Sequence, residues 1–278
     1  MKYLECYKEG CRKLTSAGIP EAELDARLLL EYICGTNRND LLVHGDREVD
    51  AENLTAYETA IVKRMERIPL QHITGEQDFM GLTFRVNEHV LIPRQDTEIL
   101  VEEILKDMQD YCRILDMCTG SGCILISLLY YNNWCEGVGV DISPMALKTA
   151  EENSKNLLSE EKQPVWLESN LFEKVEGEFD LIVSNPPYIR SEVIETLMPE
   201  VKDHEPLKAL DGTEDGLYFY REIVRQAPKY LKKEGRLYFE IGHDQGADVS
   251  ELLKQAGFKK IHVVKDYAGL DRVVYAAL

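Results

Sequence analysis

The 278-residue sequence has no long uninterrupted apolar stretch. Runs such as residues 124–129 are far shorter than the roughly 20 apolar residues that a membrane-spanning helix needs. The first residues, MKYLECYKEGCRKL, also lack an apolar core followed by a small-residue cleavage site. We therefore expect no membrane association and no secretory signal, and we expect a cytoplasmic protein.

Positive charge is scarce as well. The sequence has 32 Lys and Arg residues against 50 Asp and Glu residues, which gives a formal net charge of −18. Affinity for nucleic acid comes largely from Lys and Arg side chains that neutralise phosphates. We therefore expect no direct binding of nucleic acid, and a small molecule or a basic protein is the better candidate partner.

The cysteines show no disulfide or zinc pattern. There are seven of them, and a chain of this length needs no disulfide bonds to fold, so free thiols in a reducing compartment are expected. Cys118 and Cys123 are spaced like half of a metal site, but no second Cys/His pair follows them, and we expect no metal. The run Asp203, His204 and Glu205 has metal-binding residue types, but a solvated loop folding over the substrate is the favoured interpretation.

Residues 1–73 are predicted to form a small, all-helical domain. Pro20 begins and Gly35 ends one amphipathic pattern, and Asp50 caps the start of another. Residues 74–92 change to short extended pieces around Gly81, which predicts a β-hairpin linker. No residue of the helical part resembles a catalytic arrangement, so we expect this domain to recognise the substrate.

Residues 93–278 are predicted to form a doubly wound α/β domain. After a helix that follows Pro93, short apolar strands alternate with helices, which is typical of a mostly parallel sheet covered on both faces. The expected strands are RILDMC, EGVGVD, PVWLES, FDLIVSN and GRLYFEIG, with KKIHVVKDY and RVVYAAL as a final antiparallel pair. The expected helices are ISLLYYN, SPMALKTAEENSKN and YFYREIVRQAPKYLKK.

A glycine-rich loop, DMCTGSG, follows the first of these strands and precedes an apolar helix. Gly120 and Gly122 would let the backbone approach a ligand, and the N–H groups at the helix start would face it. Asp141 ends the next strand, where a carboxylate can accept hydrogen bonds from both ribose hydroxyls; alternatively, it caps the helix that follows. Together these features favour a nucleoside cofactor.

The loop is not the GxGxxG motif of dinucleotide-binding proteins. Asp116 before the loop would suit the cationic sulfonium of S-adenosyl-L-methionine (SAM) and would repel a pyrophosphate. Here the sequence resembles the class I SAM-dependent methyltransferases, which usually carry Gly at the position of Cys118. The resemblance implies SAM as cofactor, S-adenosyl-L-homocysteine as product, and a contact between Asn170 and the adenine. The cofactor-binding residues are then expected to be Asp116, Cys118, Thr119, Gly120, Ser121, Gly122, Asp141, Asn170, Leu171 and Asn185.

The fourth strand ends in an unusual way, FDLIVSNPPYI. Asn185 offers a side-chain oxygen, Pro186 and Pro187 present carbonyl oxygens on a rigid backbone, and Tyr188 offers a flat face. These groups suit one task, which is to hold a planar NH₂ group with its nitrogen facing a methyl donor. We therefore predict Asn185, Pro186, Pro187 and Tyr188 as catalytic residues. Enzymes with this motif methylate adenine or guanine amino groups or glutamine, so the motif alone leaves the substrate open.

The flanking sequence resembles the peptide chain release factor glutamine methyltransferases. The similar segments are RIPLQHITGEQDFMGLTFRVNEHVLIPRQDTEILVE, EVKDHEPLKALDGTEDGLYFYREIV and DYAGLDRVVYA. The resemblance implies methylation at N5 of the glutamine in the Gly-Gly-Gln loop of class 1 release factors. The alternative is methylation of an exocyclic amino group of adenine or guanine in nucleic acid. Gln95 stands where the family commonly has Pro, and Thr213 stands where it often has Gly.

A few further polar residues are of interest. Arg94 and Glu98 lie in the segment that approaches the cofactor in the family, so a supporting role is expected. Glu240 closes a predicted strand at the rim of the sheet, where a structural role is expected. His72 is predicted to be a packing residue rather than a base.

Overall fold

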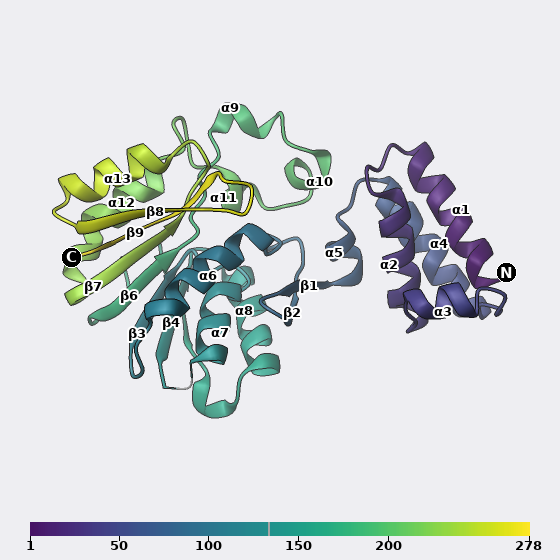
Figure 1. Cartoon of the computed structure of the whole chain (residues 1–278), viewed down its shortest axis with the longest axis horizontal. Helices are drawn as coiled ribbons and strands as arrows, with labels where there is room; N and C mark the ends of the chain where they lie inside the picture. The colour runs from purple at the N-terminus through teal and green to yellow at the C-terminus, as the bar shows by residue number, and fades with distance from the viewer. Residues whose placement is uncertain (133) are drawn as a thin grey trace. The chain divides into compact units, whose positions relative to one another are not determined.

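A seven-stranded sheet is the largest part of the structure (Figure 1). The structure is a computed structural model, and it describes residues 1–132 and 134–278. The described residues divide into two units. The helical unit comprises residues 1–75 and 198–204, and the sheet unit comprises residues 76–197 and 205–278. The division falls at Gly75, close to the predicted end of the helical domain at residue 73.

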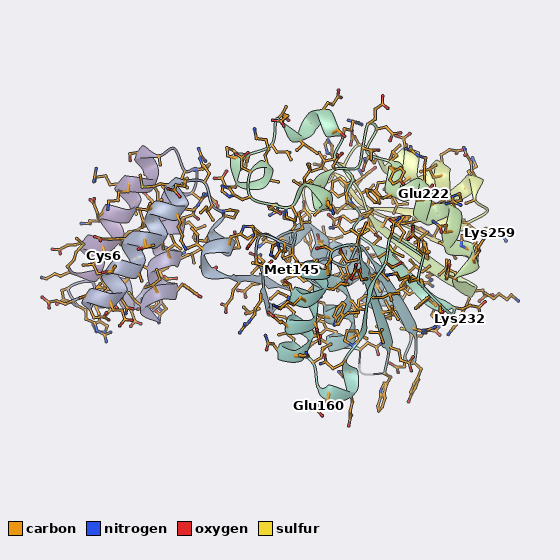
Figure 2. All side chains as sticks on the ribbon, turned by 180° about the vertical axis from the view of Figure 1, so that it is seen from behind. Cys6, Met145, Glu160, Glu222, Lys232 and Lys259 are labelled. Atoms are coloured by element: carbon orange, nitrogen blue, oxygen red, sulfur yellow. The ribbon has the colours of Figure 1, made fainter. Side chains whose placement is uncertain are left out.

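The helical unit is built from α1 (Tyr3–Ser16), α2 (Ala22–Cys34), α3 (Arg38–Val43), α4 (Ala51–Met65), α5 (Leu70–Thr74) and α10 (Pro199–Lys202). The predicted cap Asp50 and stop residue Gly35 are confirmed, whereas Pro20 lies one residue before the N-cap Glu21 of α2 and not at the helix start. Asp50 accepts a hydrogen bond from the Asn53 N–H at the start of α4, and Gly35 ends α2 in the left-handed conformation. Cys6 lies in the apolar core between these helices (Figure 2).

One segment of the helical unit comes from much later in the sequence. Residues 198–204, which the sequence assigned to the C-terminal domain, join the helical unit through a buried group of charges. Arg64 lies 2.7 Å from a carboxylate oxygen of Asp25 and 3.0 Å from one of Glu200, and all three side chains are buried. Arg67 also contacts Glu200 at 3.0 Å. Buried charges require partners of this kind, so α10 is held by ion pairs.

The predicted hairpin is confirmed. Strands β1 (Glu76–Phe79) and β2 (Leu82–Arg85) pair antiparallel. Met80 and Gly81 form the turn with φ of 51° and 70°, as a two-residue type I′ turn requires. Glu98 of α6 (Gln95–Asp107) accepts a hydrogen bond from the Met80 N–H at 2.7 Å and so fixes the hairpin to the sheet unit.

The sheet has the order β5-β4-β3-β6-β7-β9-β8. Its strands are β3 (Arg113–Met117), β4 (Glu136–Asp141), β5 (Val165–Glu168), β6 (Phe179–Ser184), β7 (Leu231–Glu240), β8 (Lys259–Lys265) and β9 (Asp271–Ala277). The strands from β5 to β7 in this order are parallel, and β9 pairs antiparallel with both β7 and β8. All seven predicted strands and the antiparallel final pair are confirmed, so the α/β, doubly wound class is correct.

Alternating strand residues build a separate core on each face of the sheet. Ile114 and Leu181 pack with α6 and α7 (Cys123–Tyr131), whereas Leu115 and Ile182 pack with α12 (Tyr218–Gln226) and α13 (Gly246–Gln255). Figure 1 shows these helices on opposite sides, with α8 (Pro144–Leu157) beside α7. The C-terminal ends of β3, β4 and β6 therefore meet at one rim, where the glycine-rich loop and NPPY lie.

The remaining elements are short: η1 (Glu160–Lys162), α9 (Ser191–Ile194), α11 (Leu207–Leu210) and η2 (Ala227–Lys229). The helix expected to run from Tyr218 through the Lys-Lys pair is shorter than predicted. It ends at Gln226 because Pro228 lacks an N–H group; η2 follows, and the Lys-Lys pair belongs to β7, which begins at Leu231. Among the described residues, no helix is long and apolar enough to cross a membrane.

Candidate active site

A cavity of about 470 Å³ opens at the rim of the sheet unit. This volume lies in the range of roughly 300–1,000 Å³ that is common for ligand pockets. Most of the predicted site residues line it, namely Cys118, Thr119, Gly120, Ser121, Asp141, Asn170, Leu171, Asn185 and Pro187. The predicted residues outside its wall are Asp116, Gly122, Pro186 and Tyr188. The two predicted halves of the site, the glycine-rich loop and NPPY, thus share one cavity.

Asp141 holds the glycine-rich loop in place. Its Oδ2 accepts a hydrogen bond from the Gly120 N–H at 2.9 Å, and its Oδ1 accepts one from the Ser143 N–H at 2.9 Å. Burial raises the pKa of Asp141, and these N–H groups lower it again. Ser143 caps α8 by accepting a hydrogen bond from the Ala146 N–H, so the alternative role of Asp141 as the helix cap is wrong. The carboxylate instead lies in the cavity wall beside the loop.

Cys118 and Gly122 both have positive φ, at 61° and 78°. Cys118 therefore keeps the left-handed backbone for which related enzymes use Gly, at a cost of about 1–2 kcal/mol. Burial raises the pKa of its thiol, so the group stays neutral. Gly122 precedes α7, and a Cβ there would lie 2.9 Å from atoms of Ile126 and Trp166. Its small size therefore serves the packing behind the loop.

Asp116 lies one layer behind the cavity. It is fully buried, and its Oδ2 accepts the Thr119 hydroxyl at 2.5 Å. Its Oδ1 has no hydrogen-bond partner among the described residues, and burial raises the pKa of this carboxyl to about 7. A cation bound in the cavity would favour the charged form. The direct contact between Asp116 and the cofactor stays a prediction.

Asn170 lies in the cavity wall just beyond β5. Its Nδ2 donates to Glu173 at 2.8 Å, which leaves Oδ1 as the free acceptor of the amide. Leu171 follows in the left-handed conformation, with φ of 49°. An acceptor at this position suits an adenine amino group, while the NH₂ group of the same amide is already bound to Glu173.

NPPY directly follows β6, and its members face different surroundings. Asn185 and Pro187 line the cavity, and Pro186 is buried. The Nδ2 of Asn185 donates to Thr97 Oγ1 of α6 at 3.4 Å, which leaves Oδ1 as the free acceptor. Tyr188 is half-buried, and its hydroxyl donates to Glu240 Oε1 at 3.4 Å.

The sequence reading missed two polar pairs near the cavity. Thr97 lines the cavity and contacts Asn185, but a threonine inside a predicted helix gives no signal of function. Glu205 is buried, forms an ion pair with Arg94 and accepts the Ile92 N–H at 3.2 Å, so its assignment to a solvated loop is wrong. Of the two residues expected to have a supporting role, Arg94 lines the cavity and Glu98 does not, and the role itself stays a prediction. In the described part of the chain, no group of three or more His, Cys, Asp or Glu residues is arranged to hold a metal ion.

Known proteins with similar sequences decide the family. The model of the PrmC N-terminal domain matches residues 5–75, and the model of the methyltransferase small domain matches residues 94–200. The release factor glutamine methyltransferase of Clostridium botulinum is 42% identical over 275 residues, which cover 96% of each chain. The one from Fusobacterium nucleatum subsp. nucleatum is 42% identical over 98% of this chain and 78% of the relative. The chain belongs to the release factor glutamine methyltransferase family.

As a release factor glutamine methyltransferase, the protein is a SAM-dependent enzyme that methylates glutamine. Its fold is also that of a methyltransferase from Pyrococcus furiosus, which is 15% identical with a TM-score of 0.56 over 77% of this chain and 98% of the other. The family resemblance predicted from the sequence is confirmed.

The residues at the cavity fit SAM. Asp141 and Asn170 place acceptors in the wall, where ribose hydroxyls and an adenine amino group require them. The Oδ1 of Asp116, for which the described residues offer no hydrogen-bond partner, adds negative potential behind the loop when the carboxyl is ionised, the form that a bound cation favours. At Gly120, φ is 57° and a Cβ would meet no atom within 4 Å, so the loop leaves space open. When bound, SAM supplies an electrophilic methyl group on a sulfonium.

Proposed function

We propose that the enzyme methylates N5 of the glutamine in the Gly-Gly-Gln loop of class 1 release factors, and that NPPY holds the glutamine amide. The observation that carries this proposal is the fixed amide of Asn185. Because its Nδ2 donates to Thr97, its Oδ1 is left to accept one N–H of a substrate amide at the cavity wall. The carbonyl of Pro186 would accept the second N–H, since NPPY is rigid at the two prolines.

Positioning supplies most of the catalysis in this mechanism. An amide nitrogen is a weak nucleophile because its lone pair is delocalised into the carbonyl group. Two acceptors that bind both N–H groups orient the nitrogen toward the methyl group and polarise it at the same time. Tyr188 would pack its ring against the planar amide. No general base is needed before transfer, because the proton can leave the methylated nitrogen afterwards.

The cofactor roles follow the cavity wall. Asp141 would accept hydrogen bonds from the ribose hydroxyls, and Asn170 and Leu171 would contact the adenine. Cys118, Thr119, Gly120 and Ser121 would surround the rest of SAM, with Gly122 and Asp116 supporting the loop from behind. The mechanism that we propose uses no metal.

The helical unit would bind the body of the release factor. Several of its large apolar side chains are exposed, including Leu24, Tyr32 and Val62. A hollow of about 610 Å³ between α2, α4 and α5 is lined partly by Tyr32 and Ala56. Of the three exposed side chains, Tyr32 lines the hollow, and an exposed apolar group at a hollow is typical of a protein-binding surface. Ala56→Arg should therefore raise KM for a full-length release factor and leave kcat for a short Gly-Gly-Gln peptide unchanged.

Two finer expectations accompany the proposal. The net charge of −18 opposes binding to nucleic acid, so the alternative substrate class has no supporting observation. All seven cysteines are free, as suits the reducing cytoplasm where we expect the enzyme to act.

The decisive experiment is mass spectrometry of a class 1 release factor after incubation with SAM and the enzyme. We expect one added methyl group on the glutamine of the Gly-Gly-Gln peptide. A release factor with Glu in place of that glutamine is the control, because it lacks the amide nitrogen and should gain nothing. Methyl transfer to nucleic acid alone, or to a different residue of the release factor, would disprove the proposal.

A further inference from the structure

Glu240 is a buried acid that the mechanism described so far does not use. It is the last residue of β7, only 1% exposed, and its Oε2 has no hydrogen-bond partner among the described residues. Strand β7 pairs with β6, and Ser184 just before NPPY lies opposite Phe239 just before Glu240. The carboxylate therefore lies directly beside the residues that are proposed to hold the substrate amide.

This carboxylate contacts Tyr188 of NPPY directly and lies near Thr97, which contacts Asn185. The Tyr188 hydroxyl donates to Glu240 Oε1 at 3.4 Å. Thr97 is 2% exposed, its hydroxyl lies close enough to Glu240 to favour the charged form of this carboxylate, and its oxygen accepts the Asn185 Nδ2–H at 3.4 Å. Glu240 thus reaches Tyr188 directly and Asn185 through Thr97.

The direction of these bonds follows from how many hydrogens each group has. An ionised carboxylate can only accept hydrogen bonds, so it attracts the single hydrogen of the neighbouring Thr97 hydroxyl. The Thr97 oxygen can then only accept from Asn185, which must turn its NH₂ toward Thr97 and its Oδ1 away from it. If the amide of Asn185 were reversed, two acceptors would face each other at a buried position, which is costly.

We propose that Glu240 and Thr97 are positioning residues, which set the orientation of the Asn185 amide and so make Asn185 an acceptor for the substrate. This inference rests on the proposed role of Asn185 in holding the glutamine amide. Neither residue would touch the reacting atoms. Their effect would pass through Asn185 and, in the case of Glu240, through Tyr188 as well.

The proposal predicts a pH dependence. Burial raises the pKa of Glu240 to about 7, the guanidinium of Arg272 on β9 favours its charged form, and Asp96 on α6 opposes it. Burial, and to a smaller extent the charge of Glu240, raises the pKa of Cys123 on α7 and of Tyr220 on α12, so both groups lie near the carboxylate. A protonated Glu240 could donate to Thr97, whose own hydrogen would then be free to turn to Asn185. The carboxylate form is therefore the active one, and kcat should rise with pH through a midpoint near 7.

The test compares Thr97→Val, Thr97→Ser and Glu240→Gln in steady-state kinetics with a full-length release factor. Thr97→Val removes the hydroxyl at constant shape and should lower kcat at least tenfold, with the dissociation constant of SAM unchanged. Thr97→Ser keeps the hydroxyl and should stay within about twofold of the wild type. Glu240→Gln should lower kcat and abolish its rise near pH 7.

Two controls separate this proposal from its alternatives. Tyr238→Phe removes the hydroxyl of a buried tyrosine on β7, the strand that ends with Glu240. This hydroxyl contacts Arg236 and not the site, so the variant should keep the wild-type kcat and pH profile. Asn185→Ala tests the proposed function itself: if that variant remained fully active, the role of Asn185 would be wrong. If Asn185→Ala is inactive while Thr97→Val and Glu240→Gln keep wild-type kcat and pH profile, the positioning role alone is overturned.

Discussion

At the scale of single residues, two departures from the family pattern lie at left-handed backbone positions. Cys118 and Thr213 replace residues that are usually or often Gly in related enzymes, and their φ angles are 61° and 73°. A further departure, Gln95, is the first residue of α6, where Pro is commonly found because the N–H there has no partner within the helix. The family pattern thus reflects the backbone, and this chain keeps the same backbone with less suitable residues.

Thr213→Gly should stabilise the protein. A β-branched residue with positive φ is strained by about 1–2 kcal/mol, and Gly relieves this strain. Gly also loses more backbone entropy on folding, which offsets about 0.5–1 kcal/mol of the stabilisation. The free energy of unfolding should therefore rise by about 0.5–1 kcal/mol, as measured by chemical denaturation. Thr196→Gly is the control, since Thr196 does not have a positive φ and its replacement should destabilise. Equal losses of stability in both variants would contradict the assignment of strain to Thr213.

Asp141→Ala should weaken SAM binding by roughly ten- to a hundredfold, because hydrogen bonds to a charged group contribute about 1.5–3 kcal/mol. The change removes the proposed ribose acceptor and releases the Gly120 N–H that shapes the loop. Calorimetry of the purified variant measures the effect. Glu168→Ala provides the matched control. Glu168 lies opposite Asp141 on the neighbouring strand β5, but it is exposed and lies outside the cavity wall. Unchanged affinity in Asp141→Ala would reduce the residue to a structural role.

At the scale of elements, the loop from Asp211 to Gly216 supports NPPY from behind. Ile189 and Asp211 form a parallel bridge, and a Cβ on Gly212 would lie 2.7 Å from the Tyr188 Cα. A Cβ on Gly216 would lie 2.5 Å from the Tyr188 carbonyl oxygen. These contacts involve main-chain atoms that cannot rotate away, so the loop and NPPY must fit each other closely.

Gly212→Ala should lower kcat at least tenfold, because the new methyl group displaces the Tyr188 main chain and with it the amide-binding groups. Steady-state kinetics with a release factor measure this loss. Gly257→Ala is a useful comparison: φ there is 91° with no atom within 4 Å, so that variant should lose stability and keep its kcat. A Gly212→Ala enzyme with normal kcat would show that NPPY tolerates the displacement.

The elements also show how far the sequence could predict the fold and the site. The strands of the sheet were predictable because each is a short apolar run between polar or turn residues. The loop and NPPY were predictable because glycines and prolines restrict the backbone in recognisable ways. The positions of Thr97 and Glu240 beside Asn185 were not, because they depend on how α6 and β7 pack around β6 and not on any local pattern.

At the scale of the whole molecule, the chain returns to the helical unit between two stretches of the sheet unit. The segment that returns, residues 198–204, is polar in sequence and gives no sign of burial. Its burial depends on the pairing of Glu200 with Arg64, which is 136 residues away in the chain. This contact explains why a domain boundary predicted from local composition assigned the segment to the other unit.

Glu200→Ala should destabilise the helical unit by about 3 kcal/mol, since removal of one partner leaves the buried Arg64 guanidinium only partly compensated by Asp25. Hydrogen exchange should show lost protection in residues 198–204 and at the contacting ends of α2 and α4, and trypsin should cleave after Lys202 more readily. Glu192→Ala, on the exposed surface of α9, should change stability by less than about 0.5 kcal/mol. The glycine-rich loop lies in the sheet unit, so SAM affinity should be unaffected by either change. Wild-type protection of residues 198–204 in Glu200→Ala would mean that apolar packing, and not the ion pairs, holds this segment to the helical unit.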